Sequence, residues 1–166
     1  DKAIKKSKKL GYLPTKSKTA SVNENRGDFL PSTTQMAIDY LSSRSTNGFF
    51  LMVEGARIDK SAHNNDYSAV VREVLDFDKA VEAAIRFAEK DGNTLVIISA
   101  DHETGALALR DGNIKEGKMK AMFVSKGHTP SWFHCLHTVH NPSFLVVFRK
   151  TAMLVIKFSN YSLNKI

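Results

Sequence analysis

FFLMV at residues 49–53 and TLVII at residues 94–98 are the two short apolar runs that decide the fold. Each is apolar at consecutive rather than alternate positions, as expected for a strand that is buried on both faces. Residues 66–90 between them carry apolar side chains at helical spacing, and Asp91-Gly92 then ends the helix. Strand, long helix and strand form a βαβ unit, which predicts an α/β fold with a parallel sheet and helices on both faces.

Length and composition agree with one modest domain: 166 residues, of which 42% are hydrophobic and 25% charged. Because no apolar run approaches about 18 residues, we expect no membrane span. We recognise no signal segment, although the chain opens with Asp1 rather than Met. The single cysteine, Cys135, excludes an internal disulfide and argues against a cysteine-based zinc site.

The formal net charge of +7 raises the question of a nucleic-acid partner. The excess of lysine and arginine is concentrated at the two ends of the chain, and the middle is nearly balanced. No basic motif is interleaved with aromatic residues in the way that single-stranded nucleic acid requires. We therefore expect a solvated lysine surface and no nucleic-acid partner.

Metal-binding residue types follow each of the two strands. Glu54, Asp59 and His63 come after the first, and Asp101 with His102 after the second. In open α/β sheets, functional groups gather at the carboxyl ends of the strands. Carboxylate and imidazole suit zinc, whereas a Glu oxygen with waters suits magnesium. Each pattern alone is more often a loop, capping or helix-start feature, but their meeting at two strand ends favours metal binding.

Three stretches carry a resemblance to a known family: FFLMVEGARID at residues 49–59, EVLDFD at 73–78 and NTLVIISADHETG at 93–105. The sequence closely resembles the C-terminal, metal-binding portion of bacterial-type alkaline phosphatase from about residue 30 to residue 105, and again at 127–129. The resemblance implies a partial sandwich of the alkaline phosphatase type. It also implies two zinc ions, one magnesium ion and a set of site residues. These are Glu54 for magnesium, Asp59, His63 and His128 for the first zinc, Asp101 and His102 for the second, and Lys60 for contact with phosphate.

The reaction that the resemblance implies is phosphomonoester hydrolysis through a phosphoserine. The parent protein would be a periplasmic or extracellular homodimer. The family's nucleophilic serine lies in an Asp-Ser-Ala motif, which this sequence does not contain. We therefore assign no catalytic residue here and expect this chain alone to be inactive. The alternatives are a non-catalytic metal-binding remnant, or another enzyme of the wider superfamily, such as a phosphomutase or sulfatase.

Residues 1–131 form the family-like part, and residues 132–166 depart from it. Restoring one nucleotide before the codon of Trp132 permits Met-Val-Pro-Leu-Phe-Ala-Tyr, the continuation that the family has at this point. We interpret residues 132–166 as an out-of-frame tail that is not a domain. On that interpretation, the cluster of metal-binding residue types in the tail is incidental: His134, Cys135, His137 and His140.

Overall fold

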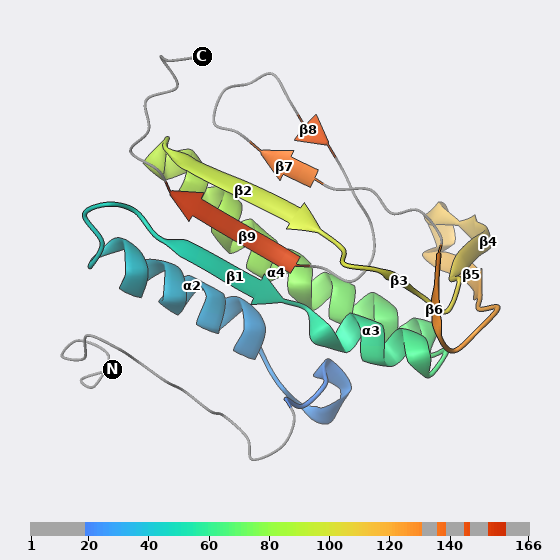
Figure 1. Cartoon of the computed structure of the whole chain (residues 1–166). Coiled ribbons are helices and arrows are strands. Elements are labelled where there is room, and N and C mark those ends of the chain that lie inside the picture. Colours follow the sequence, from blue (N-terminus) through green and yellow to red (C-terminus); the bar gives the residue numbers. More distant parts are fainter. Residues whose placement is uncertain (1–18, 131–135, 139–144, 147–152, 159–166) are drawn as a thin grey trace.

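The computed structural model describes residues 19–130, 136–138, 145–146 and 153–158, which Figure 1 draws in colour. In chain order the elements are η1 (Val22–Glu24), α2 (Phe29–Ser42), β1 (Phe50–Glu54), α3 (Ala56–His63), α4 (Tyr67–Asp91), β2 (Thr94–Ser99), β3 (Glu103–Thr104), β4 (Ala108–Asn113), η2 (Ile114–Glu116), β5 (Lys118–Met122), β6 (His128–Thr129), β7 (Leu136–Thr138), β8 (Leu145–Val146) and β9 (Met153–Phe158). The predicted α/β class is confirmed. Both predicted strands and the long helix between them begin and end within one residue of the expected positions.

Helix α4 is capped at both ends by residues suited to that role. The Asp66 side chain accepts a hydrogen bond from the Ala69 N–H at 2.9 Å, which satisfies one of the helix's first free donors. At the other end Gly92 adopts φ 74°, and its N–H donates to the Ala88 carbonyl. This left-handed residue ends the helix and turns the chain into β2.

The core lies between the helices and one face of the main sheet. Ile38 of α2, Val53 of β1, Phe77 of α4 and Val96 of β2 belong to one buried cluster. A Cβ on Gly55, directly after β1, would lie 2.9 Å from Cδ2 of Phe77. Glycine at this position therefore allows α4 to pass close to the end of β1.

A buried ion-pair network joins the η1 segment to α4. Arg26 Nη2 lies 2.6 Å from Glu73 Oε2 and 2.6 Å from Asp76 Oδ2, and all three side chains are buried. Glu73 Oε1 also accepts a hydrogen bond from the Val22 N–H at 2.8 Å. Without the guanidinium, two buried carboxylates would be left close together and uncompensated.

The main sheet has the strand order β1-β9-β2-β7-β8. Strands β1 and β2 run in the same direction, as the βαβ unit requires, because both are antiparallel to β9. This corrects the predicted parallel pairing: β9 lies between the two strands, and every neighbouring pair is antiparallel. A strand that runs in either direction can satisfy the backbone donors and acceptors of β1 and β2. Helix α4 therefore fixes the direction of β1 relative to β2, but not the direction of the strand between them.

The sequence predicts helices on both faces of the sheet, and in the described part of the chain they cover one face. Leu51 and Val53 point from β1 into the helical core, whereas Phe50 and Met52 on its other face are 63% and 54% exposed. In the described part of the chain, α2 and α4 pack against each other and against the same side of the sheet. Among the described strands, β1 lies at the edge of this sheet.

Residues 132–166, which we predict to be an out-of-frame tail, contribute the described strands β7, β8 and β9. That residues 132–166 are translated out of frame stays a prediction. His134, Cys135 and His140 lie outside the described residues, and so does most of the rest of the tail.

Two small sheets lie beyond the carboxyl ends of β1 and β2. Strand β3 pairs with β6, and β4 pairs with β5 as a hairpin. Figure 1 shows both at one end of the molecule, next to α3.

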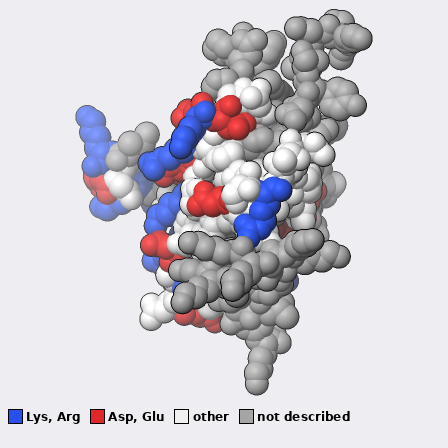
Figure 2. Space-filling model, turned by 90° about the vertical axis from the view of Figure 1, so that its left-hand side faces the viewer, with Lys and Arg blue, Asp and Glu red and all other residues white. Residues whose placement is uncertain are grey.

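The face drawn in Figure 2 carries basic and acidic side chains side by side, so its described residues form no patch of one sign there. Among the described helices, none is both long and apolar enough to cross a membrane.

Candidate metal centre

Helix α3 places the first two candidate ligands. It begins directly after β1 and Gly55, and Asp59 and His63 lie one turn apart on it. Their side chains therefore share a face, as their spacing predicts. His63 Nε2 lies 3.3 Å from Asp59 Oδ1.

Two further histidines lie near this face: His102, directly before β3, and His128, in β6. His128 Nε2 lies 3.6 Å from Asp59 Oδ1. The imidazole rings of His102 and His128 are stacked, with centroids 3.6 Å apart. Asp59, His102 and His128 each offer one ligand atom, and these atoms all lie within 4.8 Å of one another. We call these three residues the metal cluster.

The metal cluster does not coincide with either of the two predicted sets of zinc ligands. It combines Asp59 and His128 from the first set with His102 from the second. His63 stands beside it, its ring centroid 5.0 Å from that of His128. Which ligands share an ion therefore stays a prediction.

Contacts at Nδ1 fix the orientation of the His63 and His102 rings. His63 Nδ1 contacts the carbonyl oxygen of Lys126, which can only accept, so Nδ1 carries the proton. The Thr104 hydroxyl donates to Asp59 Oδ1 at 2.6 Å and lies 3.3 Å from His102 Nδ1. Because its proton goes to Asp59, the hydroxyl oxygen is left to accept from His102 Nδ1. In the neutral rings, both Nε2 lone pairs are then free for a metal.

These tautomers leave acceptor atoms facing one another. The Nε2 lone pair of His63 faces Asp59 Oδ1, and that of His102 lies 3.4 Å from Asp101 Oδ2. Two acceptors at such distances are stabilised by a cation between or beside them. Imidazole nitrogen with carboxylate oxygen is a ligand set that zinc accepts. The residues present therefore fit the metal that the sequence suggests.

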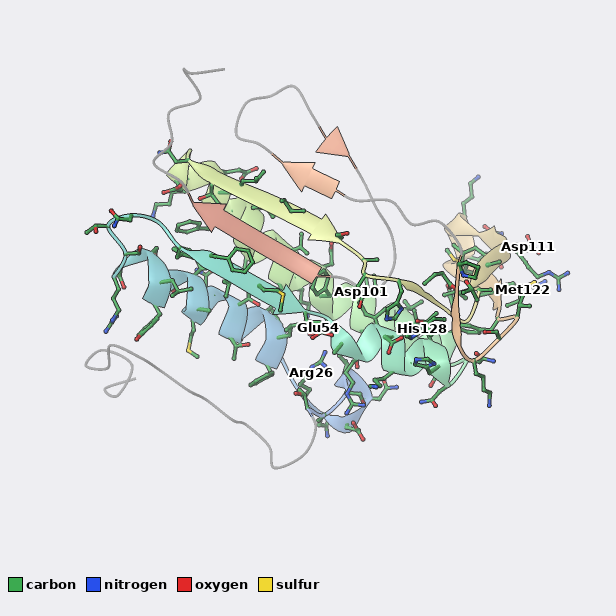
Figure 3. All side chains as sticks on the ribbon, in the orientation of Figure 1. Arg26, Glu54, Asp101, Asp111, Met122 and His128 are labelled. Atoms are coloured by element: carbon green, nitrogen blue, oxygen red, sulfur yellow. The ribbon has the colours of Figure 1, made fainter. Side chains whose placement is uncertain are left out.

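The remaining predicted residues lie around the cluster. Asp101 Oδ1 accepts a hydrogen bond from the His102 N–H at 3.0 Å, and its side chain is exposed. Figure 3 shows Glu54 at the end of β1 and Asp101 at the end of β2, on the side of the sheet nearer to His128. Glu54 and Lys60 are exposed. In the part of the chain that the structure describes, no hydrogen bond or ion pair joins either to the cluster.

Three residues that support the site are not among those predicted from the sequence: Glu103, Thr104 and Thr129. Thr104 is buried beneath Asp59, to which it donates a hydrogen bond. Glu103 is buried too and accepts a hydrogen bond from the Thr129 hydroxyl. The sequence could have indicated these residues by their position, because Glu103 and Thr104 follow His102 and Thr129 follows His128. Residues next to a ligand on a short strand help to hold that strand in place.

The fold and the cluster define an α/β protein with a candidate transition-metal site at the strand ends. Comparison with known proteins then identifies the family. A sequence model of the family described as "Alkaline phosphatase" matches residues 15–139. The chain belongs to the alkaline phosphatase family.

Individual relatives agree with this assignment. The chain is 38% identical over 137 residues to alkaline phosphatase of Escherichia fergusonii, covering 75% of this chain and 29% of that protein. It is 51% identical over 80 residues to alkaline phosphatase 4 of Bacillus subtilis, covering 48% of this chain and 17% of the relative. The chain thus spans less than a third of the length of these relatives.

Solved structures also match. A mutant of TAB5 alkaline phosphatase with Mg bound in the M3 site superposes with a TM-score of 0.69 and 32% identity, over 95% of this chain and 42% of the other. The alkaline phosphatase of the Antarctic bacterium TAB5 matches with a TM-score of 0.60 and 30% identity, over 83% and 35%.

Proposed function

We propose that this chain is the metal-binding portion of an alkaline phosphatase that hydrolyses phosphomonoesters through a phosphoserine intermediate. The observation that supports it most directly is the cluster of Asp59, His102 and His128, whose ligand atoms converge within 4.8 Å. The names and structures of the relatives support the reaction class. The serine nucleophile would come from sequence outside this chain, so we propose that the chain alone does not turn over phosphate esters.

In this proposal the ligands are divided as the family resemblance implies. Asp59, His63 and His128 hold one zinc ion, Asp101 and His102 hold a second, and Glu54 binds magnesium. Zinc would supply Lewis-acid stabilisation of the negatively charged oxygens of the phosphoryl group. The intact parent would be a homodimer of the periplasm or extracellular space.

The residues of this chain have defined tasks in such a site. The His63 and His102 rings are fixed by hydrogen bonds at Nδ1, so their Nε2 atoms point inward without reorganisation when the charge of the substrate changes. Thr104 orients the Asp59 carboxylate in the same way. Lys60, exposed on α3 next to Asp59, would attract the phosphate dianion.

Metal binding by the purified chain tests the proposal. Titration of the metal-free chain with ZnCl2 in a calorimeter should show saturable binding. Asp59→Asn should weaken it by at least about 100-fold, more than the loss of an outer-shell partner does. Asp78→Asn, which makes the same change at an exposed position of α4, is the matched control and should bind as the unmodified chain does.

The same preparation tests the proposed inactivity. We expect no zinc-dependent hydrolysis of p-nitrophenyl phosphate by the chain alone. Turnover that Asp59→Asn abolishes would contradict the assignment of the nucleophile to another part of the protein. Zinc binding that is identical in Asp59→Asn and Asp78→Asn would overturn the proposed site.

A further inference from the structure

The short ladder between β3 and β6 has two faces with different contents. Glu103 pairs with Thr129, and Thr104 pairs with His128. Since side chains alternate along a strand, Thr104 and His128 lie on the face of the metal cluster. Both contact Asp59 there: Thr104 Oγ1 at 2.6 Å and His128 Nε2 at 3.6 Å. Glu103 and Thr129 lie on the opposite face and contact each other.

Glu103 is a buried carboxylate that joins three segments of the chain. Glu103 is only 3% exposed. Oε2 accepts hydrogen bonds from the Thr129 hydroxyl and from the Ala106 N–H, the latter at 2.9 Å. Oε1 accepts from the Leu107 N–H at 3.2 Å. One side chain thus connects β3, the turn that follows it, and β6.

The turn held by Glu103 has an unusual backbone. Gly105 and Ala106 both have positive φ, 84° and 48°, and for Ala this conformation costs about 1–2 kcal/mol. The Gly105 N–H donates to the Gly127 carbonyl at 2.9 Å, so the turn also contacts the residue before His128. A partner that accepts the N–H groups of Ala106 and Leu107 stabilises this conformation and, with it, the approach of β6.

We propose that Glu103 is a positioning residue that, through Thr129 and the turn at residues 105–107, holds His128 against His102. Among the described residues, the hydrogen bonds that its carboxylate accepts come from Ala106, Leu107 and Thr129, on the face of the ladder opposite the cluster. The expected effect of Glu103 on zinc affinity rests on the proposed function, whereas its effect on the placement of the His102 and His128 rings does not.

Glu103→Gln is the informative substitution because it keeps the size of the side chain. Glutamine has one acceptor oxygen where glutamate has two, and its NH2 group would face an N–H donor. Glu89→Gln, at an exposed position of α4, is the matched control. Thr129→Val removes the hydroxyl that donates to Glu103 across the ladder and keeps the side-chain shape. Far-UV circular dichroism establishes which variants fold.

Proton NMR of the metal-free chain tests the placement itself. The stacked rings should give a nuclear Overhauser effect between the ring protons of His102 and His128. We expect it in the unmodified chain and in Glu89→Gln, weaker in Thr129→Val and absent in Glu103→Gln. An unchanged effect in folded Glu103→Gln, or no effect in the unmodified chain, overturns the proposal. If Glu103→Gln does not fold, Thr129→Val decides: an unchanged effect in that variant overturns it as well.

Metal titration separates this proposal from the proposed function. Glu103→Gln should weaken Zn²⁺ binding about 10- to 100-fold, as other losses of outer-shell support do, and should alter the visible spectrum of the Co²⁺-loaded chain. If the unmodified chain binds neither metal but the NMR results are as expected, the metal site fails and the positioning role stands. Unchanged affinity and Co²⁺ spectrum in folded Glu103→Gln count against the positioning role.

Discussion

The candidate metal centre and the exposed face of β1 differ in how completely their groups find partners among the described residues. Around the centre, Thr104, Glu103 and the Lys126 carbonyl each hold a side chain or strand in place through hydrogen bonds. On the sheet, Phe50 and Met52 of edge strand β1 stay largely exposed to solvent. The site is thus supported mainly by its own network, whereas β1 presents apolar side chains to solvent.

Arg26→Leu tests whether the site depends on the helical layer beneath it. Because the substitution leaves Glu73 and Asp76 buried without their cation, it should lower the free energy of unfolding by about 3–5 kcal/mol. Urea denaturation measures the change. If the site network is self-contained, the zinc affinity of the folded variant stays that of the unmodified chain.

Arg86→Leu is the matched control for that experiment. Arg86 forms its ion pair with Glu82 on the exposed face of α4, where such pairs contribute about 0–1 kcal/mol. Equal destabilisation by the two substitutions would show that burial of the Arg26 network carries no special weight. A parallel loss of zinc affinity in Arg26→Leu would mean that the two regions are coupled.

Gly105→Ala should damage the site region itself. Gly105 has φ 84°, and an added Cβ would lie 2.7 Å from Cδ1 of Phe123. A left-handed alanine costs about 1–2 kcal/mol, and overpacking adds about 1–3 kcal/mol. We therefore expect a loss of about 2–5 kcal/mol in urea denaturation, together with weaker zinc binding.

Gly117→Ala separates the two contributions. Gly117 also has positive φ, 61°, but nothing lies within 4 Å of the position that an added Cβ would occupy. Its substitution should cost only the backbone term of about 1–2 kcal/mol and leave zinc binding unchanged. If Gly117→Ala is as harmful as Gly105→Ala, close packing against Phe123 is not what the site requires.

The smallest effect on folding is expected on the exposed face of β1. Phe50→Ser with Met52→Ser should change the free energy of unfolding by no more than about 0.5 kcal/mol, since both side chains are exposed. It should reduce self-association, measured by light scattering as a function of concentration. Leu51→Ser, on the core side of the same strand, is the control and should destabilise the chain. If self-association is unchanged in the double variant, the exposed side chains of Phe50 and Met52 do not mediate it.

Local pattern predicted much of the architecture. The apolar runs at 49–53 and 94–98 and the helical spacing over 66–90 predicted the strands that the structure has at Phe50–Glu54 and Thr94–Ser99 and the helix between them, because both patterns depend on near neighbours. The four-residue spacing of Asp59 and His63 placed them on one helical face for the same reason. The family assignment also followed from contiguous motifs of the sequence.

Only the tertiary structure decided which groups meet across long separations. It brought His102 and His128 together over Asp59, inserted β9 between β1 and β2, and paired Glu103 with Thr129 behind the cluster. Such contacts depend on strand register and on which strand fills a gap, and no local periodicity encodes either. The sequence by itself therefore determined the fold class and the types of candidate ligand, whereas the three-dimensional packing determined their grouping and their support.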